Sequence, residues 1–405
     1  MGKVWPQGSI AFHESTTALS NIVSIDESPR WADLLIVGTD DGLVQITEDG
    51  GRTWRKVEDF PGDPKFAYVS DVQASPIDAN VMFVTLNNWQ RGDYKPYVVK
   101  SVDRGKTWTN ISGDLPALHD VWAIAQDFVA PDLLFAGTEF GLFFTVDGGK
   151  KWVQLKGGMP ATQVRDLQLQ KRESDVVMAT FGRGFWILDD YSALREVSAQ
   201  AMAEEARLFP TRAQAYQFVP WGLAQDGSAG LATLGGNYAF PNPPAGAAIT
   251  YHVRQNMGDD TQLVANIYNA QNTQVRRLTL NKNAGLYRAY WNFQFDPGVP
   301  GRAAEPEYSV PPDEVQAGQG AGAQGQGAQG QGAQGQGAGA GRAGAPAGAP
   351  PQGGRGGRGG GGATAEPGRY RIVLGKLVGE TFTPIGQPQF VQVVDLPERN
   401  YMLWR

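Results

Sequence analysis

Cysteine is absent from this 405-residue chain, and histidine occurs only three times, at His13, His119 and His252. The lack of thiols excludes disulfide bridges, thiolate metal centres and a cysteine nucleophile. Three scattered histidines argue against a histidine-clustered metal site. No GxGxxG motif after a strand and no GxxxxGK[ST] motif occurs, so the sequence gives no sign of a nucleotide site. We therefore predict neither a metal nor a cofactor.

Long apolar segments and excess positive charge are also missing. No apolar run approaches the ~18 residues that a membrane helix requires, so we predict no membrane span. The first twenty residues lack the apolar core of a secretion signal. The formal net charge of −6 argues against a nucleic-acid partner, which would require a basic face.

The chain does contain an octamer that occurs three times. Its pattern is [S/T]-x-D-x-G-x-x-W, and the copies occupy residues 47–54, 101–108 and 145–152. Each copy follows a short strand, a buried apolar run and a second strand, and each precedes a segment that ends at proline. Such phrases indicate antiparallel meanders, and meanders in series indicate propeller blades. A fourth phrase ends differently, with Gly-Arg-Gly-Phe-Trp at 182–186 in place of the octamer.

These patterns predict an all-β chain in two parts. Residues 1–192 form a partial β-propeller of four blades, and residues 193–205 form a helix-prone connector. Residues 206–405 contain six or seven short alternating strands, which suggest an immunoglobulin-like β-sandwich. A Gly-, Gln- and Ala-rich insertion at about 303–366 lies between two of these strands. It can bury little apolar surface, so we predict a disordered loop within the domain.

The octamer has a structural explanation that needs no ligand. Glycine tolerates positive φ and an Asp side chain bonds backbone amides across a tight turn, while the Trp can fold back between blades. We therefore predict a structural role for nine residues: Asp49, Gly51, Trp54, Asp103, Gly105, Trp108, Asp147, Gly149 and Trp152.

The octamer resembles the Asp-box, or BNR repeat, of sialidases, xyloglucan-hydrolysing propellers and the sortilin ectodomain. Phrases at 38–43, 137–142 and 179–190 are similar to bacterial proteins described as glycosyl hydrolase or sortilin N-terminal-domain proteins. The resemblance implies a secreted or periplasmic parent protein that carries further N-terminal blades and a C-terminal immunoglobulin-like domain. We therefore expect the chain to be part of a longer protein, with the additional blades as its partner. The Arg-Ile-Pro phrase of sialidases does not occur, so a typical sialidase is not expected.

In a propeller, the turns between second and third strands open on one face together with the inter-blade loops, and the octamer turns open on the other. Ligands generally use the former face, near the axis. We predict a set of ligand-face residues there, namely Asp40, Trp89, Arg91, Tyr94, His119, Phe140 and Arg183. The inter-blade loops add Asp63, Lys65, Asp120 and Arg165 to this face.

Three functions remain open at this point. The first is binding of a glycan or of a peptide or protein ligand on the face that carries these residues. The second is glycoside hydrolysis, which requires two carboxylates about 5–9.5 Å apart. The third is an assembly or scaffold role toward a protein partner. The weak catalytic candidates are Asp41, Asp93, Asp120 and Glu139, and for each of them a role as a solvated turn residue is the favoured explanation.

Overall fold

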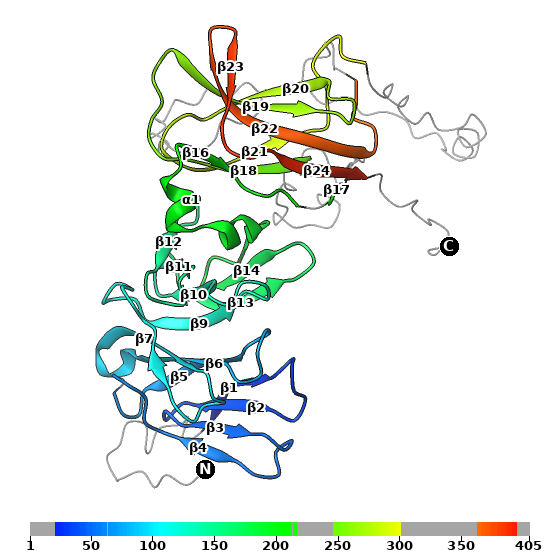
Figure 1. Ribbon diagram of the computed structural model, residues 1–405. Coiled ribbons are helices and arrows are strands. Elements are labelled where there is room, and N and C mark those ends of the chain that lie inside the picture. The colour runs from blue at the N-terminus through cyan, green and yellow to red at the C-terminus, as the bar shows by residue number, and fades with distance from the viewer. Residues whose placement is uncertain (1–20, 63, 213, 217–245, 301–362, 395–405) are drawn as a thin grey trace, which may run out of the picture.

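The computed structural model describes residues 21–62, 64–212, 214–216, 246–300 and 363–394. Nearly half of these residues lie in strands, almost all of them paired antiparallel, and the strands group into separate sheets that follow one another along the chain (Figure 1). The chain is thus all-β, with propeller-type blades, as predicted.

Four sheets make up the N-terminal part, and each is a meander in chain order. Blade 1 contains β1 (Ile22–Glu27), β2 (Leu35–Thr39), β3 (Val44–Thr47) and β4 (Arg55–Val57). Blade 2 contains β5 (Tyr68–Ala74), β6 (Met82–Asn88), β7 (Asp93–Ser101) and β8 (Thr109–Asn110). Blade 3 contains β9 (Val121–Gln126), β10 (Leu134–Thr138), β11 (Gly141–Thr145) and β12 (Val153–Leu155). Blade 4 has three strands, β13 (Val164–Gln170), β14 (Asp175–Thr180) and β15 (Phe185–Leu188).

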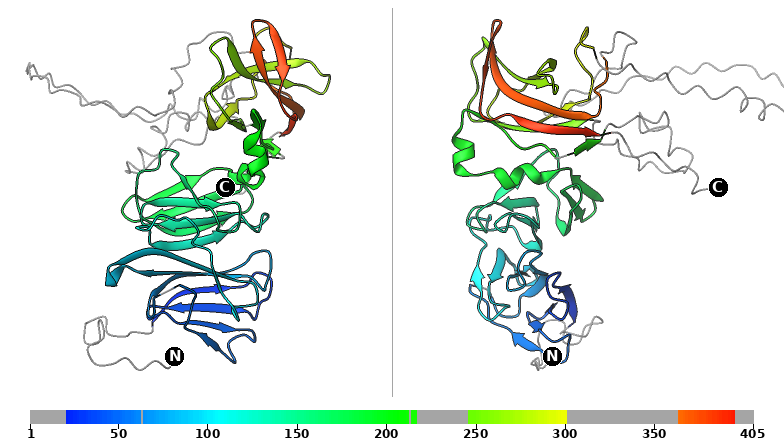
Figure 2. Two further views of the ribbon diagram at one scale, coloured as in Figure 1. Left: turned by 60° about the vertical axis from the view of Figure 1, so that its left-hand side comes forward. Right: turned by 45° about the vertical axis from the view of Figure 1, so that its right-hand side comes forward.

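The blades stack face to face in chain order, as Figure 2 shows from two sides. Their first strands lie next to one another in the order β1, β5, β9 and β13. Within the described residues, no comparable contact joins β13 to β1. The four blades therefore form an open arc around the side that the first strands line.

Apolar side chains fill the three spaces between blades. One cluster lies between blades 1 and 2 and includes Ile36 and Val84. A second, with Phe83 and Phe143, lies between blades 2 and 3. The third separates blades 3 and 4 and includes Phe135. Each fully buried side chain of this size stabilises the fold by about 1.5–3 kcal/mol, so these layers hold the stack together.

Polar side chains of the first strands add hydrogen bonds between blades. In β1, the Ser24 hydroxyl and the Asp26 carboxylate accept from backbone N–H groups of β5 at 2.8 and 2.7 Å. In β5, Asp71 and Gln73 accept in the same way from β9 at 3.0 and 2.8 Å. Blades 1 and 2 therefore each satisfy backbone N–H groups of the next first strand with side-chain acceptors.

The octamers form tight turns at the outer strands. The Asp103 carboxylate accepts from the Thr107 N–H at 2.8 Å and from the hydroxyls of Thr107 and Ser101 at 2.6 and 2.8 Å. The Thr107 hydroxyl is the main reason that the pKa of Asp103 lies well below its usual range. Asp49 and Asp147 make the corresponding bonds with their own turns.

The octamer Trp side chains differ in their packing. Trp152 is buried between blades 2 and 3 and donates to the Ile111 carbonyl at 3.1 Å. Trp108 packs edge-on against Phe60, with ring centroids 5.3 Å apart. The expectation of packing between blades is wrong for Trp54, which is 43% exposed because no described blade precedes blade 1.

The connector contains a 3-10 helix, η2 (Tyr191–Glu196), and a short α-helix, α1 (Ala199–Ala203). Asp127, buried at the end of β9, accepts from the Tyr191 hydroxyl at 2.6 Å and from Arg195 at 2.8 Å. These two bonds hold η2 against blade 3. Removing the Arg195 guanidinium would leave the buried Asp127 carboxylate without its partner charge, which is strongly destabilising.

The C-terminal part is a β-sandwich of two sheets around one core. One sheet has the order β16 (Ala206–Leu208), β18 (Ala247–Val253) and β21 (Gly285–Trp291). The other has the order β17 (Gln214–Tyr216), β24 (Gln389–Val394), β22 (Gly368–Val378), β19 (Thr261–Tyr268) and β20 (Gln274–Leu280), with β23 (Thr381–Pro384) paired to β22. An immunoglobulin-like relationship remains a prediction.

The predicted low-complexity loop falls mostly on residues 303–362, which lie outside the described residues. Its last predicted residues belong to the sandwich, because Thr364 forms a β-bridge with Gln294 and Ala365 is fully buried. Among the described helices, none is long and apolar enough to cross a membrane.

A matched pair of glycines tests the packing of the octamer turn. Gly105 and Gly92 both have φ of 73°, but a Cβ on Gly105 would lie 2.2 Å from Ile46 Cδ1, whereas a Cβ on Gly92 would meet nothing within 4 Å. We expect Gly92→Ala to cost roughly 1 kcal/mol for the left-handed backbone. Gly105→Ala should cost roughly 1–3 kcal/mol more for overpacking. Urea unfolding measures both, and equal losses would contradict the packing of this turn against blade 1.

Candidate functional site

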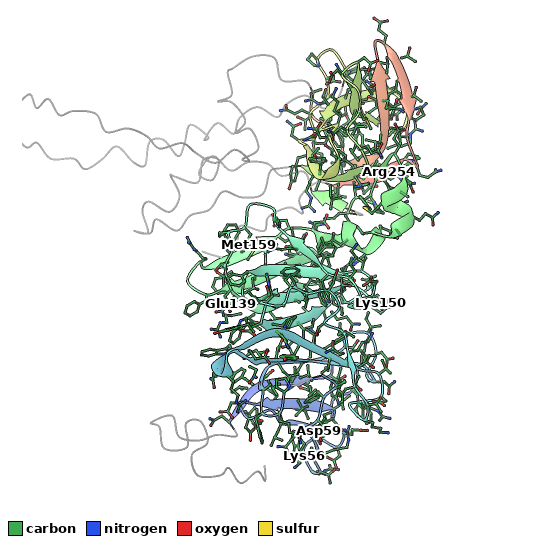
Figure 3. The ribbon with its side chains drawn as sticks, turned by 90° about the vertical axis from the view of Figure 1, so that its left-hand side faces the viewer. Lys56, Asp59, Glu139, Lys150, Met159 and Arg254 are labelled. Carbon is green, nitrogen blue, oxygen red and sulfur yellow. The ribbon has the colours of Figure 1, made fainter. Side chains whose placement is uncertain are left out.

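Blade 3 shows the two ends of a blade clearly. Glu139 lies in the turn between β10 and β11, and Lys150 lies in the octamer turn between β11 and β12. In Figure 3 these two residues lie on opposite sides of the stack. The octamer turns are therefore remote from the face that carries the predicted ligand residues, which we call the axial face.

A cluster of charged, amide and aromatic side chains lies on the axial face of blades 3 and 4. Glu139 Oε2 accepts from Trp122 Nε1 at 3.1 Å and also from the Gln163 side-chain amide. The Arg165 guanidinium carbon lies 3.7 Å from the Trp122 ring centroid and 5.4 Å from that of Phe181. Arg165 Nε also donates to Gln163 Oε1 at 2.5 Å. We call these five residues the Glu139–Arg165 cluster.

A β-bulge at the same position in each first strand explains this arrangement. The pairing register with the second strand shifts once in every blade, and the extra residues are Val23, Ser70, Trp122 and Arg165. A bulge re-aims its extra side chain and often occurs beside functional sites. Trp122 and Arg165 thereby lie outside the apolar clusters between blades, with the buried Trp122 ring beneath the exposed Arg165 guanidinium.

Exposed aromatic rings surround the cluster. Phe181 is 70% exposed in the turn between β14 and β15, and Phe140 is exposed beside Glu139. His119 packs edge-on against Phe140, with centroids 5.3 Å apart. Trp89, also exposed, is the first residue of the 3-10 helix η1 (Trp89–Arg91) between β6 and β7, and the exposed Tyr94 lies near the start of β7. Exposed apolar side chains that lie together mark interaction sites, whereas apolar residues scattered singly over a surface do not.

Buried polar groups lie beneath this surface. Asp120 is 1% exposed, and its Oδ1 has no hydrogen-bond partner among the described residues. The same is true of both amide atoms of Asn87 and of His119 Nδ1. Burial, followed by the charges of Glu139 and Asp93, raises the pKa of Asp120 to about 7. Burial also lowers the pKa of His119, although the Glu139 charge opposes this effect.

Other predicted residues form hydrogen bonds within their own turn or to a neighbouring segment. Arg91 donates to the Phe66 carbonyl at 2.7 Å, and Asp93 accepts from the Tyr97 hydroxyl at 2.7 Å. In blade 1, the Asp40 carboxylate accepts from Asn21 at 3.0 Å. Asp41 is buried and accepts from the Thr39 hydroxyl at 2.5 Å within the same turn. Arg183 is exposed in the turn between β14 and β15.

The structure therefore brings Glu139, Phe140, His119 and Asp120 together and separates them from the Asp40–Asp41 turn. Asp63 lies outside the described residues, and Lys65 lies 3.9 Å from Asp59 in an exposed ion pair. Sequence reasoning placed Arg165 on this face but missed Trp122, Gln163 and Phe181. An alignment of the four first strands would have placed Trp122 and Arg165 at equivalent positions. It would not have predicted the bulge, because the residue at that position differs in every strand. Within the described ranges, no group of three or more His, Asp or Glu side chains could hold a metal ion.

Comparisons with known proteins add little beyond the fold. No family model matches the chain, and no curated protein matches it. Among solved structures it is similar to YCF48 from Cyanidioschyzon merolae, at 21% identity and a TM-score of 0.32, over 42% of this chain and 53% of that one. It is also similar to YCF48 bound to D1 peptide, at 16% identity and a TM-score of 0.31, over 48% of this chain and 60% of that one.

The aligned region spans less than two thirds of either neighbour. Likeness at these identities and TM-scores carries no conclusion about function. The Asp-box, sortilin and immunoglobulin-like resemblances therefore remain predictions.

The raised pKa of Asp120 gives a pH test of the site. The folded-state pKa of about 7 exceeds the ordinary value of 3.8. Protonation of Asp120 therefore contributes to the stability of the fold fully below about pH 4, and this contribution is lost as the pH rises through 7. We expect Asp120→Asn to gain stability relative to wild type between pH 5 and pH 8, on the order of 2 kcal/mol. Thermal unfolding at both pH values measures this difference. An Asp120→Asn difference that does not change with pH would contradict a protonated buried carboxyl.

Proposed function

We propose that this protein is an extracytoplasmic binding protein that holds an extended peptide segment of a partner across the axial face of blades 2–4. The Glu139–Arg165 cluster is the observation that carries this proposal. It combines a positioned cation, a positioned carboxylate and exposed aromatic rings on one surface. Such a surface suits a ligand with both a backbone and apolar side chains.

Arg165 is the residue best prepared for recognition. Its guanidinium lies against Trp122 and is held by Gln163, so little side-chain freedom remains to be lost on binding. A planar guanidinium in this setting binds a carboxylate through two hydrogen bonds. We infer that Arg165 pairs with an acidic side chain or C-terminal carboxylate of the ligand.

The neighbouring groups supply the remaining contacts. Both hydrogen bonds to Glu139 fall on Oε2, which leaves Oε1 toward a ligand N–H or lysine. Phe140 and Phe181 offer apolar ring faces without hydrogen-bonding groups, which suit aliphatic or aromatic side chains. We favour a peptide over a glycan, because the hydroxyls around the edge of a sugar ring would need hydrogen-bond partners that these two rings do not offer.

A displayed library of random peptides, selected on the full chain, tests this proposal. We expect recovered peptides to share an acidic residue or a terminal carboxylate. Their Kd, measured by fluorescence anisotropy, should rise at least about tenfold in Arg165→Gln and in Phe181→Ala, which is about 1.4 kcal/mol each.

The sandwich provides a matched control for these variants. Arg369 stacks on the exposed Phe390 ring at 3.9 Å, which repeats the Arg–Phe chemistry of the cluster at a remote site. Arg369→Gln and Phe390→Ala should leave the Kd unchanged. Failure to recover any binding peptide, or equal losses in the control variants, would contradict the proposal.

One observation favours the second candidate function, glycoside hydrolysis. A carboxyl group with a pKa near 7 beside a second carboxylate is the arrangement of a general acid and its partner, and Asp120 and Glu139 are such a pair. The burial of Asp120 weighs against it, since a substrate oxygen would have to reach the group. Release of reducing sugar from a polysaccharide panel, abolished by Glu139→Gln, would establish this second function.

A further inference from the structure

Blade 4 carries an apolar sheet face that has no neighbour in the described structure. In each blade, one face packs against the next blade, and we call it the leading face. In blade 3, the paired residues Phe135 and Phe144 of this face are buried against blade 4. The corresponding face of blade 4 pairs Val177 with Ile187 and Ala179 with Phe185. Phe185 is 75% and Ile187 57% exposed.

Polar groups on the same face repeat the pattern that joins blade 1 to blade 2 and blade 2 to blade 3. Counted from the bulge, Asp166 and Gln168 of β13 occupy the positions that Asp71 and Gln73 occupy in β5. In β5 this pair accepts hydrogen bonds from the first strand of the next blade. In β13 both side chains are exposed. Blade 4 therefore presents the acceptors of a blade junction as well as its apolar residues.

The opposite end of the arc carries the complementary surface. The trailing face of a blade is the one that packs against the preceding blade. Ile25 occupies the position of Val72 in the next first strand, yet it is 64% exposed whereas Val72 is 3% exposed. The exposed Trp54 shares this end, although its counterpart Trp152 is buried in blade 3.

Backbone N–H groups of β1 are the donors that correspond to the acceptors on blade 4. The N–H groups of Val72 and Ala74 bond to the side chains of the preceding blade. In β1 the same register positions belong to Ile25 and Glu27. The acceptors at the blade 4 end thus correspond to donors at the blade 1 end, and each end is complementary to the other and not to itself.

We propose that a second copy of this chain occupies these surfaces, with the leading face of blade 4 docked on the trailing face of blade 1. This heterologous contact continues the interface that already joins blades 1 to 4 within one chain. A contact of this type closes into a ring or grows into a filament. Two copies close an eight-bladed ring, which lies within the range of propeller sizes.

Among the described residues, the sandwich contacts blade 4 at the ends of its strands. Arg288 donates to the backbone carbonyls of Asp189 and Asp190 just after β15, and Arg212 pairs with Glu173 in the turn between β13 and β14. Ring closure would also place the Asp40 end of the second copy beside the Phe181 turn. The proposal does not depend on the peptide-binding function, because it rests on other faces of the blades.

Sedimentation velocity of the full chain tests this assembly. We expect a discrete dimer at micromolar concentration that Phe185→Glu converts to monomer and that Ile25→Glu also converts to monomer. An equimolar mixture of the two variants should recover a dimer, because one copy retains a native leading face and the other a native trailing face. An interface between identical patches would show no such recovery.

Val378→Glu serves as the control, since Val378 is an exposed apolar residue of the sandwich and should not change the dimer. A single cooperative thermal unfolding transition in each monomeric variant would show that it is folded. A wild-type monomer, a dimer that neither variant disrupts, or a polymer that grows without limit would each overturn the proposal.

Discussion

A small β-sheet cannot bury both of its faces by itself, and the N-terminal part of this protein depends on that constraint. Blades 1 to 3 each cover their leading face with the next blade, and burial in the three apolar layers stabilises the stack. Stacking also brings the four first strands side by side. The axial face exists only because of this arrangement, since its residues come from separate blades.

The bulge in each first strand converts a structural repeat into a varied surface. Each first strand contains one bulged residue, and its type differs from blade to blade: Val23, Ser70, Trp122 and Arg165. The four bulge residues do not belong to the apolar clusters between blades, so those clusters do not fix which residue type stands there. Blades 3 and 4 use this position for the Trp–Arg stack, which makes them the chemically distinctive half of the arc.

Carboxylates near the axis carry an energetic cost. Burial is the main reason that the pKa of Asp71 is raised to about 7, although its hydrogen bond from Ile124 opposes the rise. Asp26 shows the same direction for the same main reason. These groups join adjacent blades through their acceptor oxygens, so the polar junctions contribute geometric specificity more than net stability. The apolar layers offset their desolvation.

The sequence was sufficient for the features that repeat or that act locally. Three octamers and four apolar phrases determined the all-β class, the number of blades and the unusual end of blade 4. They also indicated that Asp49, Asp103 and Asp147 belong to turns, because the residues that satisfy each carboxylate lie within a few positions of it. The face opposite the octamers was likewise predictable from the order of strands.

Tertiary structure decided which residues meet. Glu139 bonds Trp122 and Gln163 across two blades, and neither partner carries a sequence signal, because a bulge and an inter-blade contact are properties of packed strands. The packing of the octamer Trp was also decided in this way: the same motif buries Trp152 and exposes Trp54. A side chain's burial depends on whether another blade covers it, and no local pattern of residues encodes that neighbour.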